Sequence, residues 1–204
     1  MLGLLFELAA ARQRRPHPND GRLRICDRFA DVPVVNQFGS RFRFHRDFVG
    51  GRMLVVSTMY TECRGTCPTT TRTLQRLREE LSPALGPALA FMSISLDPAV
   101  DRPDVLRSYA KRYGADAAAP GLCPWHFLTG EKSDLEKLRK SLGMYDLNPA
   151  VEADITRHES TLLFGNCDRD RWATLSAGLR LPLLIEALRR VVGTTPEQRF
   201  GFKI

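Results

Sequence analysis

The stretch YTECRGTCPTTTRTL, residues 60–74, holds two cysteines, Cys63 and Cys67, with three residues between them and Pro68 directly after them. The apolar run MLVVSTM, residues 53–59, precedes the stretch and is typical of a short buried strand. Leucines then recur with the spacing of one helical face, at Leu74, Leu77 and Leu81. Because proline suits the first turn of a helix, where its missing N–H needs no partner, the sequence predicts that the cysteines occupy a strand-to-helix junction.

Apolar runs and amphipathic segments alternate along the rest of the chain. Two apolar runs around Asn36–Ser40 predict a β-hairpin over residues 32–44. Further strands are predicted at 89–96, 125–130 and 160–165, and further helices at 102–114, 131–143 and 178–192. This alternation predicts an α/β fold with a central mixed sheet flanked by helices. The order of the elements is that of a thioredoxin-like fold with an added N-terminal β-hairpin.

Length and composition fit one globular domain. The 204 residues are 43% hydrophobic and 26% charged, which suffices for one hydrophobic core. We expect that domain to cover residues 25–204, after an N-terminal helix and linker, or a vestigial signal, at residues 1–24. The apolar run at the N-terminus is too short to span a bilayer, so membrane association stays open. The net charge of +7 comes mostly from scattered arginines without interleaved aromatics, and nucleic acid is therefore not an expected partner.

The predicted junction favours chemistry that uses thiolates. The free N–H groups and the positive dipole end of the following helix point at the loop, and both lower the pKa of a cysteine there. Three intervening residues let both sulfurs turn to one side, as positions i and i+4 of a helical turn do. Such a pair suits copper(I), zinc or an iron–sulfur cluster, with a third ligand from elsewhere in the chain. Without a metal, the same pair suits a thiol–disulfide oxidoreductase.

Four motifs, in the same order along the chain, resemble the Sco/SenC family, copper proteins that help to assemble the CuA centre of cytochrome c oxidase. The motifs are CxxxCP at 63–68, SISLDPAVDRPDVLRSYAKRYG at 93–114, WHFLTG at 125–130 and RHESTLLFGNCDRD at 157–170. The resemblance covers residues 29 to 192. It implies that copper, as Cu(I) or Cu(II), is bound by three ligands with a supporting carboxylate: Cys63, Cys67 and His158, with Asp97.

The resemblance also implies a function. The protein would be a metallochaperone or assembly factor for the CuA centre, rather than an enzyme, with thiol–disulfide reductase activity as its one expected reaction. Its partners would be the CuA-bearing oxidase subunit or another copper protein, and a thiol reductant. Its place would be the periplasm, or the periplasmic side of the membrane. Two alternatives remain: a thioredoxin-type oxidoreductase, which would not need His158, and a copper or redox sensor.

The sequence departs from the family pattern beside both halves of the implied site. Arg64 and Gly65 stand where the family usually has Pro and Asp, and Arg157 stands where it often has an acidic residue. The two added positive charges are expected to favour thiolate, to disfavour cationic copper and to change the choice of partner.

The remaining cysteines match no ligand of the family. The odd count of five favours one functional pair with isolated thiols over a fully paired scaffold. Cys26 carries no assignment, and Cys167 is a candidate auxiliary thiol near the site. Cys123 and His126 form a C-x-x-H pair, which would need further ligands to bind a metal.

Two aspartates in the second motif also fit purely structural roles. Asp97 stands before a proline, which is typical of a turn. Asp101 is expected to cap the helix that begins near Pro103.

Overall fold

The chain forms seven strands and five α-helices in a computed structural model that describes residues 23–116, 121–158 and 160–192. The strands are β1 (Pro33–Asn36), β2 (Arg41–Arg43), β3 (Met53–Met59), β4 (Leu89–Ser95), β5 (Trp125–Thr129), β6 (Thr161–Asn166) and β7 (Arg171–Ser176). The helices are α1 (Cys67–Leu85), α2 (Pro103–Lys111), α3 (Lys132–Ser141), α4 (Pro149–Glu152) and α5 (Leu181–Val192). The segment predicted at residues 1–24 lies outside the described residues, apart from its last two.

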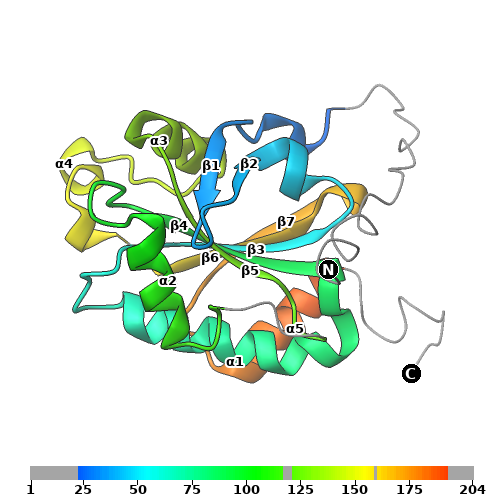
Figure 1. Cartoon of the computed structure of the whole chain (residues 1–204). Coiled ribbons are helices and arrows are strands. Elements are labelled where there is room, and N and C mark those ends of the chain that lie inside the picture. The colour runs from blue at the N-terminus through cyan, green and yellow to red at the C-terminus, as the bar shows by residue number, and fades with distance from the viewer. Residues whose placement is uncertain (1–22, 117–120, 159, 193–204) are drawn as a thin grey trace, which may run out of the picture.

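The strands form one mixed sheet in the order β2-β1-β5-β4-β3-β6-β7 (Figure 1). The three central strands β3, β4 and β5 run parallel, and the other strands join them through antiparallel pairs. The prediction of a mixed sheet with an N-terminal hairpin is therefore confirmed. The two innermost strands, β3 and β4, are buried along their whole length, which explains why they appear in the sequence as unbroken apolar runs.

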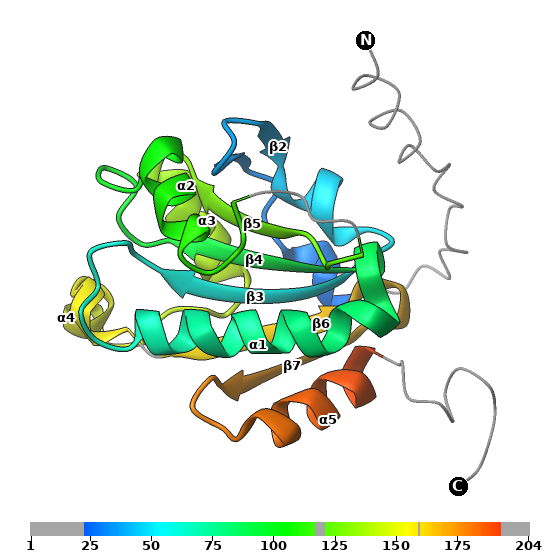
Figure 2. The same cartoon turned by 60° about the horizontal axis from the view of Figure 1, so that its bottom comes forward.

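Helices cover both faces of the sheet (Figures 1 and 2). On one face, α1, α2 and α5 bury their apolar stripes in one core cluster, which includes Leu77, Leu106 and Leu188. On the other face, α3 and the segments before β1 and after β2 form a second cluster around Leu138, Phe29 and Phe48. Because β3 and β4 run parallel, their carboxyl ends lie at the same end of the sheet.

The strand β7 has no counterpart in the sequence prediction. It lies at the edge of the sheet, and each of its residues is exposed or half-buried. Trp172 packs on one face of the sheet, and Ala173 and Leu175 pack on the other, but exposed residues interrupt them and no continuous apolar run results. Its antiparallel pairing with β6 is nevertheless close, since a Cβ added at Gly165 would lie 2.4 Å from the carbonyl oxygen of Arg171.

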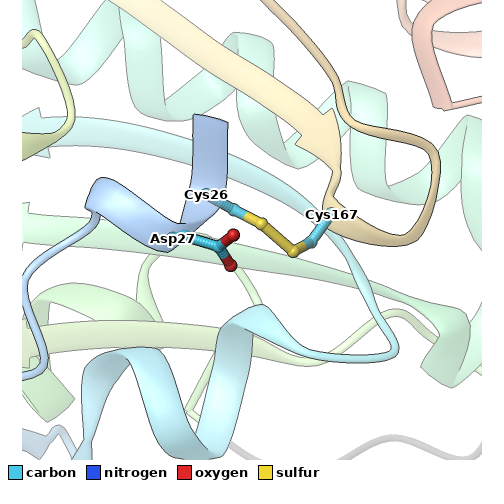
Figure 3. Close-up of side chains that lie close together, drawn as sticks. All are labelled: Cys26, Asp27 and Cys167. Atoms are coloured by element: carbon cyan, nitrogen blue, oxygen red, sulfur yellow. A yellow bond between two sulfur atoms is a disulfide. The ribbon is translucent and has the colours of Figure 1, made fainter. Parts of the chain in front are cut away.

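Cys26 and Cys167 form a disulfide, so the expectation that they are isolated thiols is wrong (Figure 3). The bond joins a short helix at Ile25–Arg28 to the end of β6, and both side chains are buried. The two cysteines are 141 residues apart, and no local pattern in the sequence pairs them. Asp27 lies beside the bond, but the sulfurs are bonded to each other, so this group of three offers no metal site.

None of the helices in the described ranges is long and apolar enough to cross a membrane.

We predict that the Cys26–Cys167 disulfide contributes strongly to stability. The variant Cys26→Ala/Cys167→Ala should lose about 2–5 kcal/mol of unfolding free energy, because its unfolded chain gains the freedom of a long open loop. Urea denaturation with and without dithiothreitol measures this. Reductant should destabilise the wild type by a similar amount and leave the variant unchanged. A wild type that is equally stable in dithiothreitol would contradict the prediction.

Candidate metal centre

The two cysteines of the CxxxC motif lie at the predicted strand-to-helix junction. Cys63 belongs to the loop after β3, and Cys67 is the first residue of α1. The N–H of Cys63 donates to the carbonyl of Tyr60 at 3.3 Å, which folds the loop into a turn. Cys67 is anchored from its other side, because the Thr71 hydroxyl donates to its carbonyl at 2.7 Å. Both thiols are free and largely buried, with 9% of Cys63 and 2% of Cys67 exposed.

His158 reaches the same place from a distant part of the chain. It follows the short helix Ile155–Arg157 and precedes β6. Its Nε2 atom lies 3.4 Å from the Sγ atom of Cys67, although the two residues are 91 positions apart. The ring of Tyr60 packs edge-on against the imidazole, with 5.7 Å between the ring centroids. The structure therefore brings together the histidine and the second cysteine of the predicted ligand set.

The hydrogen bonds of His158 decide which ring nitrogen carries the proton. Nδ1 lies 2.6 Å from the carbonyl oxygen of Ile155. Because a carbonyl oxygen only accepts, Nδ1 must donate, and in the neutral ring the lone pair is then on Nε2, which faces Cys67. A backbone carbonyl on the far nitrogen is the arrangement that orients a metal-binding histidine.

The three candidate ligands do not yet form a closed site. In the described part of the chain, only Cys26, Asp27 and Cys167 bring three such ligand atoms within 4.8 Å of one another. The ligand atoms of Cys63, Cys67 and His158 therefore do not all lie within this distance of one another. Cys67 and His158 are close enough to share an ion. A three-coordinate site would additionally need the Cys63 sulfur, which already contacts the Cys67 thiol, to approach the imidazole of His158.

The two thiols differ in acidity. Burial alone would raise the pKa of Cys63, but hydrogen bonds from the Cys67 thiol, the N–H groups of Cys67 and Gly65, and the Tyr60 hydroxyl lower it overall. Burial and the neighbouring Cys63 raise the pKa of Cys67 to about 12. Cys63 is therefore the first of the pair to lose its proton, and Cys67 keeps its proton at neutral pH. A soft cation would displace the second proton.

Asp101 has a role that sequence reasoning missed, and its predicted role as a helix cap is wrong. Arg102 occupies the cap position of α2, whereas the carboxylate of Asp101 is fully buried. It accepts hydrogen bonds from the N–H and hydroxyl of Thr61, at 3.1 and 2.5 Å, and from the Ser95 hydroxyl at 2.6 Å. Asp101 therefore ties the loop that carries Cys63 to the end of β4.

Asp97 lies in the turn after β4, as a residue before proline suggests. Its carbonyl accepts from the N–H of Asp101 at 2.8 Å, and its own N–H donates to the Ser95 hydroxyl at 3.0 Å. Its half-buried carboxylate has no hydrogen-bond partner among the described residues. A supporting role at the metal stays a prediction.

The segment before His158 is held by an ion pair that no motif indicated. Arg139 on α3 and Glu152 on α4 meet at 2.7 Å, and both are largely buried. Arg139 also donates to the carbonyl of Met144, and Glu152 accepts from the N–H of Asp146. These contacts fix the long connection between α3 and β6, and with it the approach of the histidine.

The other predicted candidates lie away from the site. Cys167 is in the disulfide and is no auxiliary thiol. Cys123 packs in the core cluster under α1, whereas the ring of His126 contacts Phe42 and Phe48 on the opposite face of the sheet. Burial lowers the pKa of His126 to about 4, which keeps it neutral. The C-x-x-H pair therefore does not converge on a metal.

The two arginines that depart from the family pattern flank the site on its solvent side. Arg64 and Arg157 are both exposed, so solvent screens their effect on the buried sulfurs. The donors that stabilise the Cys63 thiolate are the groups named above. We expect the arginines to act mainly on approaching partners.

We predict that Tyr60→Phe raises the pKa of Cys63, because it removes a hydroxyl that stabilises the thiolate but keeps the ring against His158. The pH profile of Cys63 alkylation should have its midpoint below the ordinary thiol value of about 8.5 in the wild type and should move upward in the variant. Tyr145→Phe, at an exposed tyrosine, is the matched control. A profile that Tyr60→Phe leaves in place would contradict the hydrogen bond.

Comparison with known proteins places this site in a family. The model of the SCO1/SenC family matches residues 30–193. A Stutzerimonas stutzeri protein that carries the provisional name of a copper-binding protein is 29% identical over 152 residues, which cover 73% of this chain and 68% of the relative.

Two solved structures show the same fold. A SCO1/SenC family lipoprotein from Bacillus anthracis has a TM-score of 0.62 at 20% identity, over 80% of this chain and 95% of its own. Copper-bound ScoI from Arabidopsis thaliana has a TM-score of 0.61 at 14% identity, over 79% of this chain and 96% of its own. The thioredoxin-like fold prediction is thereby confirmed. Because the family model matches residues 30–193, which are most of the chain, the chain belongs to the SCO1/SenC family.

Proposed function

We propose that this protein binds one copper ion through Cys63, Cys67 and His158 and delivers it during assembly of a copper protein. The observation that carries the proposal is the position of the His158 Nε2 lone pair, 3.4 Å from the Cys67 sulfur, beside a second cysteine whose pKa is lowered. An oxidoreductase would need the cysteines alone. An oriented imidazole that faces a sulfur is the added feature that a metal site requires.

The donor set fits copper in both oxidation states. Two thiolate sulfurs and one imidazole nitrogen are soft to intermediate ligands and suit three-coordinate copper(I). Copper(II) prefers more nitrogen and oxygen ligands, and water or the Asp97 carboxylate would complete its coordination. The copper-bound relative from Arabidopsis thaliana supports this assignment.

We infer that the recipient is the CuA-bearing subunit of cytochrome c oxidase or another copper protein. The support is family membership together with a site whose first cysteine lines a cavity at the start of α1, where a partner can approach it. A thiol reductant is the second expected partner, because the ligands must be thiolates before copper binds. Reduction of the recipient's own cysteines is the second candidate function, and the acidic Cys63 thiol favours it.

The proposed location is outside the cytoplasmic membrane. The buried disulfide between Cys26 and Cys167 supports it, because such bonds form and persist in oxidising compartments. The comparison with a family lipoprotein from Bacillus anthracis is consistent with attachment to a membrane surface.

The reduced protein should bind one copper(I) per chain, and Cys63→Ser or Cys67→Ser should reduce this to a small fraction, because each removes half of the soft ligands. Metal analysis after desalting under reductant measures the stoichiometry. Cys123→Ser, at the remaining free thiol, is the control and should retain full binding. Unchanged copper in either of the first two variants would refute the ligand assignment.

His158→Ala should weaken copper(II) more than copper(I), because imidazole suits copper(II) while the thiolates hold copper(I) nearly alone. We expect the copper(II) loss to exceed the roughly 10-fold effect typical of losing an outer-shell partner. Competition titrations in both states measure it, with His45→Ala as the control. Equal losses in the two states, or none, would count against His158 as a ligand.

Oxidation should join Cys63 to Cys67 and abolish copper binding until a thiol restores the pair. Four positions of separation at a turn allow the ~4.4–6.8 Å between Cα atoms that a disulfide needs. Peptide mass mapping identifies the linkage, and copper titration before and after reduction tests the gate. The prediction fails if either cysteine pairs with Cys123 instead, or if the oxidised protein binds copper fully.

A further inference from the structure

A cavity of about 360 Å³ opens directly beside Cys63. The loop and α1 contribute Cys63, Arg72 and Gln75 to its wall, and α2 and the residues after it contribute Tyr109, Arg112 and Tyr113. Of the three candidate copper ligands, Cys63 is the one that lines it. The volume falls within the ~300–1,000 Å³ range of small-molecule sites.

Two exposed guanidinium groups give this cavity a positive rim. Arg72 and Arg112 are exposed, and neither forms an ion pair with a carboxylate in the described part of the chain. The Arg112 guanidinium lies 5.0 Å from the centre of the Tyr109 ring, a cation–π contact that holds it over the buried tyrosine floor. The neighbouring Glu79 accepts a hydrogen bond from Gln75 and does not line the cavity.

We propose that this cavity binds a small thiol that carries a carboxylate, with the carboxylate at Arg72 and Arg112 and the sulfur directed at Cys63. Guanidinium groups are suited to carboxylates, and a cavity that combines them with one accessible redox sulfur selects a ligand with both functions. The inference rests on the proposed function, because it assigns a chemical class to the thiol reductant of the same cysteine pair.

The reaction that the cavity would promote is thiol–disulfide exchange at Cys63. The thiolate of the bound ligand attacks the Cys63 sulfur of the oxidised pair, a bond forms between these two sulfurs, and Cys67 leaves as a thiolate that takes a proton from solvent. The thiolate of a second ligand molecule attacks the ligand sulfur of the mixed disulfide and releases the Cys63 thiolate. Two ligand thiols are oxidised to one ligand disulfide, and one protein disulfide is reduced.

Alkylation of the reduced protein tests the cavity without any disulfide. Iodoacetate carries a carboxylate where iodoacetamide carries a neutral amide. Peptide mass analysis gives the rate at which each reagent alkylates Cys63. Each rate is divided by the rate of that reagent with a small neutral thiol. The corrected rate for iodoacetate should be roughly five-fold higher, as two exposed charge contacts would produce. The preference should shrink in high salt.

Matched variants separate the cavity from net charge. Arg72→Gln/Arg112→Gln should remove the preference, whereas Arg28→Gln/Arg189→Gln, at two exposed arginines elsewhere, should retain it. Equal corrected rates in the wild type would overturn the inference. An equal loss in both double variants would overturn it too, because a general charge effect would then suffice.

Reduction of the oxidised protein tests the ligand class. With rates corrected against a small uncharged disulfide, 3-mercaptopropionate should outperform 2-mercaptoethanol by roughly five-fold, again only while Arg72 and Arg112 are present. A preference seen with an acidic cysteine peptide but not with 3-mercaptopropionate would overturn the small-thiol assignment in favour of a protein partner. Absence of a Cys63–Cys67 disulfide would refute the proposed redox gate, while the alkylation result would still decide on the cavity.

Discussion

The antiparallel pairing of β6 with β3 is the constraint on which the candidate site depends. Its register sets Met53 opposite Asn166 and Val56 opposite Leu163, so the start of β6 lies at the carboxyl end of β3. The cysteine loop follows β3, and His158 precedes β6. If β6 ran parallel to β3, the histidine before it would lie at the opposite end of the strands. The contact between sulfur and imidazole is thus a consequence of strand direction.

Most of the fold could be predicted because its signals are local. Buried strands appear as apolar runs, and proline and glycine mark the ends of the helices, so β3 and α1 lie where the sequence places them. The site was harder to predict from the sequence. A histidine alone carries no signal, and resemblance to a family was needed to single out His158. The Asp101 network, the Arg139–Glu152 ion pair and the Cys26–Cys167 disulfide join distant segments, and no spacing in the sequence encodes such pairs.

Buried and exposed charged side chains have different roles in this architecture. The buried carboxylate of Asp101 and the paired Arg139 and Glu152 hold the two loops of the site, where low dielectric makes hydrogen bonds strong. The exposed arginines around the cysteine loop make few contacts of their own. They give the surface around the site a positive charge, which favours anionic partners. Copper binding then depends on the soft ligands themselves.

The central claim is that both cysteines and His158 bind the same copper ion, which requires the Cys63 sulfur to approach the His158 imidazole. X-ray absorption spectroscopy of the copper(I)-loaded protein tests this most directly. The account predicts two sulfur atoms and one imidazole nitrogen around copper, and loss of the imidazole contribution in His158→Ala. A spectrum with sulfur ligands alone, or one that His158→Ala leaves unchanged, would contradict it.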